Sequence, residues 1–176
     1  MSEYAVTAIG RDRPGIVAAL SGLLFDLGGN IEDSRMSILG GHFAGMLIVD
    51  LPAGVAAASL GDGLEAVRRD LGLEAVSLNE VASIGREDAG ASHVLTVYGA
   101  DRPGIVHSVT AVLAERGVNV TDLSTRVTGG ESPVYVMLIE LGLGEVAEDD
   151  LRDAVGAAAE KLEVDVSLRR IEAEAL

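Results

Sequence analysis

One segment of six residues that occurs twice constrains this chain more than any other feature. Residues 12–17 read Asp-Arg-Pro-Gly-Ile-Val, and residues 101–106 repeat them letter for letter. An alternating run typical of a strand precedes each copy, over residues 3–9 and 93–98. A helical pattern follows each copy, so the chain contains a duplicated strand-turn-helix.

The similarity between the copies continues beyond this segment. At the same offset, Gly28, Asn30 and Asp33 return as Gly117, Asn119 and Asp122. The second copy then gains two residues near Ser132-Pro133, after which Met46-Leu47-Ile48 matches Met137-Leu138-Ile139. It later loses one residue, after which Val76-Ser77-Leu78 matches Val166-Ser167-Leu168. A period of about 90 residues indicates two duplicated domains rather than a solenoid of short repeats.

Each copy has the pattern strand, helix, strand, strand, helix, strand. A stripe at Ile16, Leu20, Leu23, Leu24 and Leu27, and one at Ile105, Val109, Val112 and Leu113, predict the first helices. Gly28 and Gly117 then suit left-handed helix ends. The second strands run from Asn30 to about Leu39 and from Asn119 to about Val127, followed by hairpin turns at Gly40-Gly41 and Gly129-Gly130.

The second half of each copy repeats a helical spacing. The expected core positions are Leu60, Leu64, Val67 and Leu71 in the first copy and Leu151, Val155, Ala158 and Leu162 in the second. Gly61 and Gly63 weaken the earlier helix, so we expect it to begin near Asp62. Carboxylates at 148–150 favour the first turn of the later helix. The fourth strands are expected over residues 76–84 and 164–171.

The third strands, residues 43–51 and 134–141, are apolar on both alternating faces. This pattern predicts burial on both sides of the sheet, either against the other copy or against another chain.

The pattern predicts an α+β protein with two ferredoxin-like βαββαβ domains, each an antiparallel four-stranded sheet with helices on one face. We expect domains over residues 1–86 and 93–176 and a polar linker over 87–92.

Charge and composition exclude several classes of function. The net charge is −15, divided as −7 over residues 1–88 and −8 over 89–176, so the chain lacks the basic surface that direct nucleic-acid binding requires. No apolar run is long enough to span a membrane, and no signal peptide is visible. With no cysteine, disulfides and thiolate metal sites are excluded, and we expect a cytoplasmic protein.

The repeated turn has the chemistry of an anion site. We expect Asp12 and Asp101 to cap the helices that follow, and Pro14 and Pro103 to lie in first helical turns. Gly15 and Gly104 permit close approach, and the remaining free N–H groups favour a carboxylate. Asn30 and Asn119 are expected at the same edge of the domain, where they would either hold an amino acid or serve as turn residues with positive φ.

The strand, the Asp-Arg-Pro-Gly-Ile-Val turn, the amphipathic helix and the following Gly-x-Asn together resemble the ACT domain. The resemblance covers both copies and nearly the whole chain, and the pair without an appended enzyme is similar to small tandem-ACT regulators of the glycine cleavage repressor type. It implies amino-acid binding at domain interfaces, and frequent dimerisation. By position, the resemblance implies ligand contacts from Asp12, Arg13, Pro14, Gly15, Ile16, Asn30 and Ile31, and from Asp101, Arg102, Pro103, Gly104, Ile105, Asn119 and Val120. Well-known amino-acid-binding members carry Asn where this chain has Asp12 and Asp101, which changes the expected orientation of the ligand.

Signals for catalysis are weak. His42, His93 and His107 show no metal-ligand spacing, and neither a nucleophile elbow nor a P-loop occurs. We expect no enzyme activity, no cofactor and no metal. Two hypotheses stay open: an amino-acid-responsive regulator, with glycine or serine as the first ligands to test, and an interaction module without a small ligand. Either would act as a homodimer or through a protein partner such as a transcription regulator.

Overall fold

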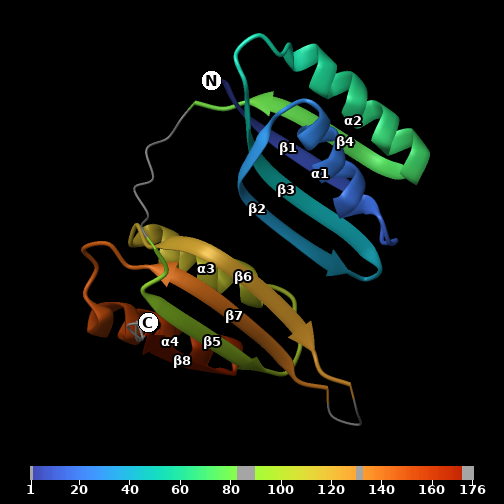
Figure 1. The fold of residues 1–176 in the computed structure, drawn as a ribbon. Helices are drawn as coiled ribbons and strands as arrows, with labels where there is room; N and C mark the ends of the chain where they lie inside the picture. Colours follow the sequence, from blue (N-terminus) through green and yellow to red (C-terminus); the bar gives the residue numbers. More distant parts are fainter. Residues whose placement is uncertain (1, 83–89, 130–132, 172–176) are drawn as a thin grey trace. The chain divides into compact units, whose positions relative to one another are not determined.

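The structure of the protein is a computed structural model that describes residues 2–82, 90–129 and 133–171. The chain separates into two compact units, Met1–Gly85 and Arg86–Leu176. In Figure 1 both units show the predicted order of elements. Of the linker predicted over residues 87–92, residues 87–89 lie outside the described residues, so its bounds and those of the domains stay predictions.

The first unit is a four-stranded antiparallel sheet with two helices. Its strands lie in the order β2-β3-β1-β4. The elements are β1 (Ser2–Arg11), α1 (Ile16–Asp26), β2 (Asn30–Leu39), β3 (His42–Leu51), α2 (Ala57–Leu71) and β4 (Leu73–Glu80).

The second unit repeats this topology, with its strands in the order β6-β7-β5-β8. The elements are β5 (His93–Gly99), α3 (Ile105–Glu115), β6 (Asn119–Val127), β7 (Tyr135–Gly142), α4 (Glu148–Leu162) and β8 (Val164–Arg170). The predicted fold class is confirmed in both units.

In each unit the two helices pack on one face of the sheet and enclose an aliphatic core. The first core includes Val6, Ile16, Leu20, Val49, Leu60 and Leu64. The second includes Leu95, Ile105, Val109, Leu113, Ile139 and Leu151. The predicted helix stripes therefore face the core, except that Ala159 is the buried alanine of α4 rather than Ala158.

Glycines end the first helices and turn the first hairpin as predicted. Gly28 has φ 69° and Gly117 has φ 70°. In each unit two amides bond back to the last helical turn, from Gly28 to Phe25 and from Gly117 to Ala114 among others, which is a Schellman motif. Gly40 and Gly41 have φ 58° and 82°, as a type I′ hairpin turn requires. Of the second predicted turn, Gly130 lies outside the described residues.

Helix α2 begins at Ala57, so the expected start near Asp62 is wrong. Leu60 and Leu64 are almost fully buried, and this packing outweighs the low helix propensity of Gly61 and Gly63. Gly63 also has a packing role, because a Cβ at this position would lie 2.3 Å from Leu23 Cδ1 of α1. The fourth strand of the first unit likewise begins and ends earlier than predicted, at Leu73 and Glu80.

The register of the central strands corrects the alignment of the two copies by one residue. Gly10 pairs with Phe43 and its counterpart Gly99 pairs with Tyr135, so Met46 corresponds to Leu138 and not to Met137. A shift of one residue moves a side chain to the other face of a sheet. Met46 is accordingly 48% exposed, whereas Met137 is fully buried.

The third strands are buried on the helix-covered face only. On the opposite face Met46 and Leu138 stay exposed, so the predicted burial of both faces is not met within the units. In the described part of the chain, no helix combines the length and the apolar character needed to cross a membrane.

Candidate functional site

The repeated turn ends at a glycine that begins the first helix of each unit. Gly15 is the N-cap of α1 with φ 99° and ψ −12°, and Gly104 is the N-cap of α3 with φ 96° and ψ −5°. Glycine adopts such left-handed conformations without the steric penalty of a side chain. The carbonyl of Gly15 accepts the first helical hydrogen bond from Ala19 at 2.9 Å. The backbone conformation therefore explains the repeated glycine.

The aspartates of the turn do not cap these helices, contrary to the prediction. Neither α1 nor α3 has a side-chain hydrogen bond at its N-terminus, because the cap position, three residues after the aspartate, is a glycine. Pro14 also precedes the helix instead of entering its first turn. Asp12 fixes the turn through its backbone, whose N–H donates to the Gly41 carbonyl at 2.9 Å.

The first N–H groups of both helices thus keep their capacity to bind an anion. We call residues 12–17 the first corner and residues 101–106 the second corner. A Cβ built at Gly15 or Gly104 would meet no heavy atom within 4 Å, so each corner is open on this side. Val17 and Val106, at the start of the helices, are exposed beside it. Each corner presents amide donors, a carboxylate and an apolar side chain.

The arginine of each corner reaches the C-terminal end of the second helix of its unit. The Arg13 guanidinium lies 3.7–4.0 Å from where a Cβ of Gly72 would be. Arg102 Nη1 forms an ion pair with Glu163 Oε2 at 2.5 Å. Gly72 and Glu163 are the left-handed C-caps of α2 and α4. Both arginines therefore lie where the helix dipole favours a cation, but only in the second unit does the C-cap residue itself carry a carboxylate.

A second difference between the corners lies in the central strand. Tyr135 in the second unit corresponds to Phe43 in the first, and both are buried. Burial raises the pKa of the Tyr135 hydroxyl, a hydrogen bond with Thr125 lowers it, and the Asp101 carboxylate raises it further. The second corner therefore has a buried phenol near its aspartate, whereas the first has a phenyl ring.

The sequence predicted that Asn30 and Asn119 lie at the same edge as the corners of their own units. This prediction is wrong, because each asparagine lies at the opposite end of its sheet. Asn30 pairs with Asp50, which pairs in turn with Glu3 at the beginning of β1, whereas the corner follows the end of β1. Nine residues of strand separate the two positions by about 30 Å. Asn119 pairs with Gly142 at the corresponding end of the second sheet.

The asparagines are also not positive-φ turn residues. Among the described non-glycine residues only Glu163 has positive φ, and Gly28 and Gly117 take that conformation before the asparagines. Asn30 Nδ2 donates to Glu32 Oε1 at 2.7 Å. Register shifts follow at Ile31/Asp33 and Val120/Asp122, so a β-bulge occurs at the same place in both units. No residue pattern in the sequence predicted these bulges.

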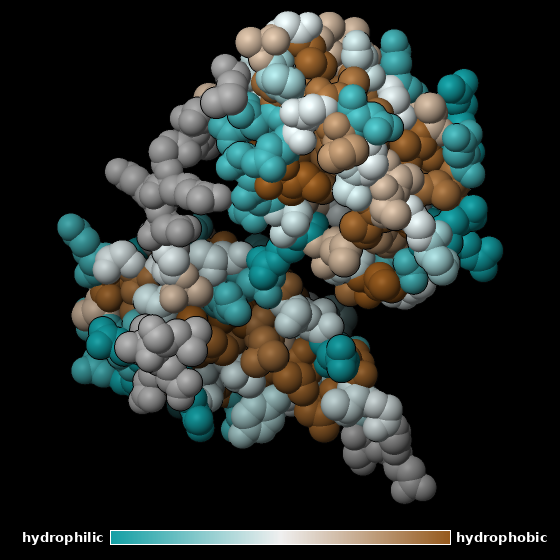
Figure 2. Space-filling model, viewed as in Figure 1, coloured by the Kyte–Doolittle hydropathy of each residue, from teal (hydrophilic) through white to brown (hydrophobic). Residues whose placement is uncertain are grey.

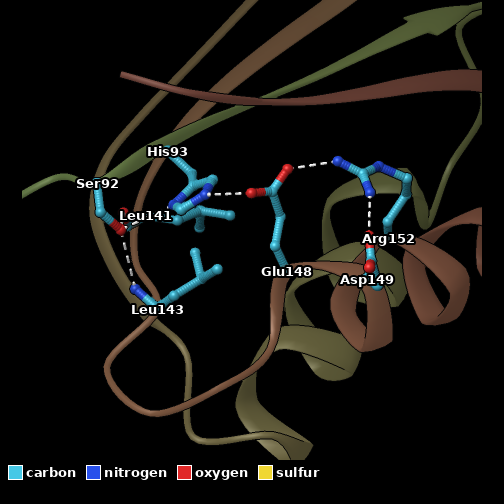
Figure 3. Close-up of polar contacts among 7 residues, drawn as sticks. All are labelled: Ser92, His93, Leu141, Leu143, Glu148, Asp149 and Arg152. Carbon is cyan, nitrogen blue, oxygen red and sulfur yellow. Dashed lines mark hydrogen bonds and ion pairs between the residues drawn. The ribbon is translucent and has the colours of Figure 1, made fainter. Parts of the chain in front are cut away.

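Sequence reasoning also missed a polar cluster at the beginning of the second unit (Figure 3). His93 is 3% exposed; its Nδ1 lies 2.9 Å from Ser92 Oγ and its Nε2 lies 3.2 Å from Glu148 Oε2. The Ser92 hydroxyl donates to the Leu141 carbonyl at 3.2 Å and accepts from the Leu143 amide at 3.3 Å. Arg152 pairs with Glu148 and, at 2.5 Å, with Asp149.

Ser92, His93 and Glu148 contact one another in the same order as the serine, histidine and carboxylate of a hydrolase triad. The arrangement here is nevertheless structural. The Ser92 hydroxyl is held by two backbone groups, and the imidazole is buried. The hydrogen bond from His93 and the neighbouring Arg152 lower the pKa of Glu148, although partial burial opposes them. The cluster therefore joins the start of β5 to the first turn of α4.

The other histidines form no comparable group with the residues that the structure describes. His42 Nε2 lies 3.7 Å from Glu74 Oε1 on the surface. Within residues 2–82, 90–129 and 133–171, His, Cys, Asp and Glu side chains nowhere gather in threes as metal ligands.

Comparison with models of known protein families identifies the same kind of domain in both units. Models of the ACT domain match residues 4–77 and residues 93–159. A UPF0237 protein of Methanopyrus kandleri is 44% identical over 73 residues, which span 42% of this chain and 80% of that protein.

Two relatives extend over both units. The glycine cleavage system transcriptional repressor of Escherichia coli is 27% identical over 133 residues, or 72% of this chain and 66% of the repressor. An unknown protein from Galdieria sulphuraria, whose crystal structure is solved, has 29% sequence identity to this chain and a TM-score of 0.80 over 97% of this chain and 99% of that one. The tandem arrangement therefore recurs in a solved structure.

Proposed function

The chain belongs to the ACT domain family, with two such domains in tandem, and on that premise we propose that it is a non-enzymatic regulator that binds a free amino acid. The corners are the proposed ligand sites. The observation that carries this proposal is the start of α1 and of α3, where a glycine N-cap leaves backbone amides without a side-chain acceptor beside open space.

An amino acid suits the charges at the corners. Its carboxylate would bind the free amides of the helix start, and its ammonium would face Asp12 or Asp101, neither of which caps its helix. The exposed Val17 and Val106 leave room for a small apolar side chain. Glycine and serine are the first candidate ligands. The proposed contact residues are those predicted from the sequence, residues 12–16, 30–31, 101–105 and 119–120.

A ligand that contacts both a corner and an asparagine requires two ACT units, because these groups lie at opposite ends of one unit. Such a ligand would stabilise the associated state of two units and shift their equilibrium by its difference in affinity for the two states. A cytoplasmic homodimer is the assembly we propose. By analogy with the Escherichia coli repressor, the regulated process would be amino-acid metabolism, with glycine as the first candidate.

Isothermal titration calorimetry against glycine, serine and then the other amino acids tests the proposal. We expect saturable binding to the folded chain, and weaker binding after Asp12→Ala or Asp101→Ala. A folded protein that binds none of the twenty amino acids at millimolar concentration would overturn it.

The alternative is an interaction module without a small ligand, and the exposed edge strand β2 favours it. Every residue of β2 is exposed, including Met36, Ile38 and Leu39, and apolar patches lie among polar residues on the surface in Figure 2. An exposed apolar edge strand is a site for pairing with another chain. The net charge of −15 favours a protein partner, such as a transcription regulator, over nucleic acid. A partner retained equally with and without amino acids in a pull-down would favour this alternative.

A further inference from the structure

The second unit has a side-chain connection at its entry that has no counterpart among the described residues of the first unit. We call Ser92, His93 and Glu148 the entry clasp. Through Ser92 it holds the end of β7 and the loop that begins at Leu143, and through His93 it reaches the first residue of α4 (Figure 3).

The first unit provides an internal comparison. Tyr4 pairs with Val49 as His93 pairs with Leu141, so tyrosine takes the place of histidine. Helix α2 begins at Ala57, whereas α4 begins at Glu148. The first turn of α2 contains no acidic residue, and that of α4 contains three. A backbone hydrogen bond at this place is common to both units: the Val81 N–H donates to the Glu3 carbonyl in the first, and the Ile171 N–H donates to the Ser92 carbonyl in the second. Only the side-chain part of the clasp differs.

The burial of His93 makes these hydrogen bonds costly to break. A buried polar group that loses its partner retains the full desolvation penalty, and a bond to a charged group is stronger than one between neutral groups. Separation of α4 from β5 would break the hydrogen bond between the imidazole and the Glu148 carboxylate in addition to the apolar contacts of the helix. Among the described residues of the first unit no such side-chain bond joins α2 to β1, and Gly61 and Gly63 weaken α2 further.

We propose that the entry clasp makes the second unit the more stable half, so that under native conditions α2 opens more readily than α4. The expected difference is about tenfold or more in the exchange rates of the protected amides.

Hydrogen exchange of the full-length chain at pH 7, followed by mass spectrometry, tests this inference. Peptides over residues 57–64 and 148–155 are compared in the wild type, in Glu148→Gln and in His93→Tyr/Glu148→Ala, which gives the second unit the residues of the first. We expect the wild-type peptide over 148–155 to exchange at least about tenfold more slowly than its counterpart, and both variants to reduce that protection while residues 57–64 stay unchanged.

Equal exchange of the two peptides in the wild type would overturn the proposal. So would unchanged protection of residues 148–155 in Glu148→Gln, whatever the double variant does. If the double variant unfolds the whole second unit while Glu148→Gln loosens α4 alone, the proposal is supported.

Discussion

Arg102 of the second corner is paired at 2.5 Å with Glu163, the described non-glycine residue that has positive φ. A left-handed conformation costs a non-glycine residue about 1–2 kcal/mol, whereas an exposed ion pair contributes about 0–1 kcal/mol. The first unit has Gly72 at this helix end, with φ 61°.

We therefore expect Glu163→Gly to leave the free energy of unfolding unchanged or to raise it by up to about 1 kcal/mol, because relief of strain outweighs the loss of the ion pair. Glu163→Ala, which removes the pair and keeps the strain, is the control and should be destabilised. Urea unfolding measures both. A glycine variant less stable than the alanine variant would contradict the explanation.

Gly15→Ala and Gly104→Ala should each destabilise the chain by about 1–2 kcal/mol through the backbone alone, since the added Cβ meets no neighbour. Gly22→Ala in the middle of α1, also without neighbours, is the control and should stabilise by about 0.5–1 kcal/mol. Thermal unfolding monitored by circular dichroism reads all three. Equal effects at Gly15 and Gly22 would show that the left-handed φ does not decide the identity of the residue.

The two glycines of α2 should respond differently to alanine. At Gly61 the nearest atom to an added Cβ is 3.9 Å away, so Gly61→Ala should stabilise the first unit by about 1 kcal/mol. At Gly63 the Cβ would lie 2.3 Å from Leu23 Cδ1, so displacement of Leu23 should cancel most of that gain. Denaturant midpoints of the two variants give the comparison, and equal gains would mean that Leu23 moves aside freely.

The second unit should lose stability in acid through Glu148. Its pKa is lowered from 4.5 in the folded state, first by the hydrogen bond to His93 and also by Arg152. A carboxyl with a lowered pKa stabilises the folded state above its unfolded pKa, and this contribution disappears as the pH falls through the folded pKa. Hydrogen exchange of α4, corrected for the intrinsic rate, should therefore show a loss of protection below about pH 4.5. Glu148→Gln should flatten this dependence, and an unchanged profile in that variant would assign it to other carboxyls.

Asn30→Ala should weaken amino-acid binding about tenfold, because one hydrogen bond to a charged ligand is lost. Stability should change little, since the bond from Asn30 to Glu32 is exposed. Ser37→Ala on the same strand is the control and should retain affinity. Calorimetry with whichever amino acid binds the wild type measures the effect, and unchanged affinity in Asn30→Ala would remove this residue from the site.

The elements of the fold were predictable because each is encoded locally. Alternating residues before the corners and the stripe from Ile16 to Leu24 give the strands and helices, and paired glycines give the hairpin turn at Gly40-Gly41. Register is different. Met46 and Met137 match as letters, but only strand pairing shows that they point to opposite faces.

The candidate site was predictable in its residues and not in its arrangement. Asp12 is a residue type that often caps helices. The position of the cap, however, depends on the φ of Gly15, which the amino-acid sequence does not show. His93 and Glu148 are 55 positions apart, so no local pattern joins them. A comparison of the copies contained the signal, because His93 and Glu148 replace residues of different chemistry, Tyr4 and Ala57, at corresponding places.

Each corner is separated from the asparagine of its own unit, so a ligand that contacts both groups must bind two units. Its response to protein concentration depends on whether one chain or two chains supply these units. If the two units of one chain supply the groups, the apparent affinity is independent of protein concentration. If two chains supply them, ligand binding becomes tighter as the protein is concentrated, and dilution releases the ligand. The same chain would then respond to its own abundance as well as to the amino acid.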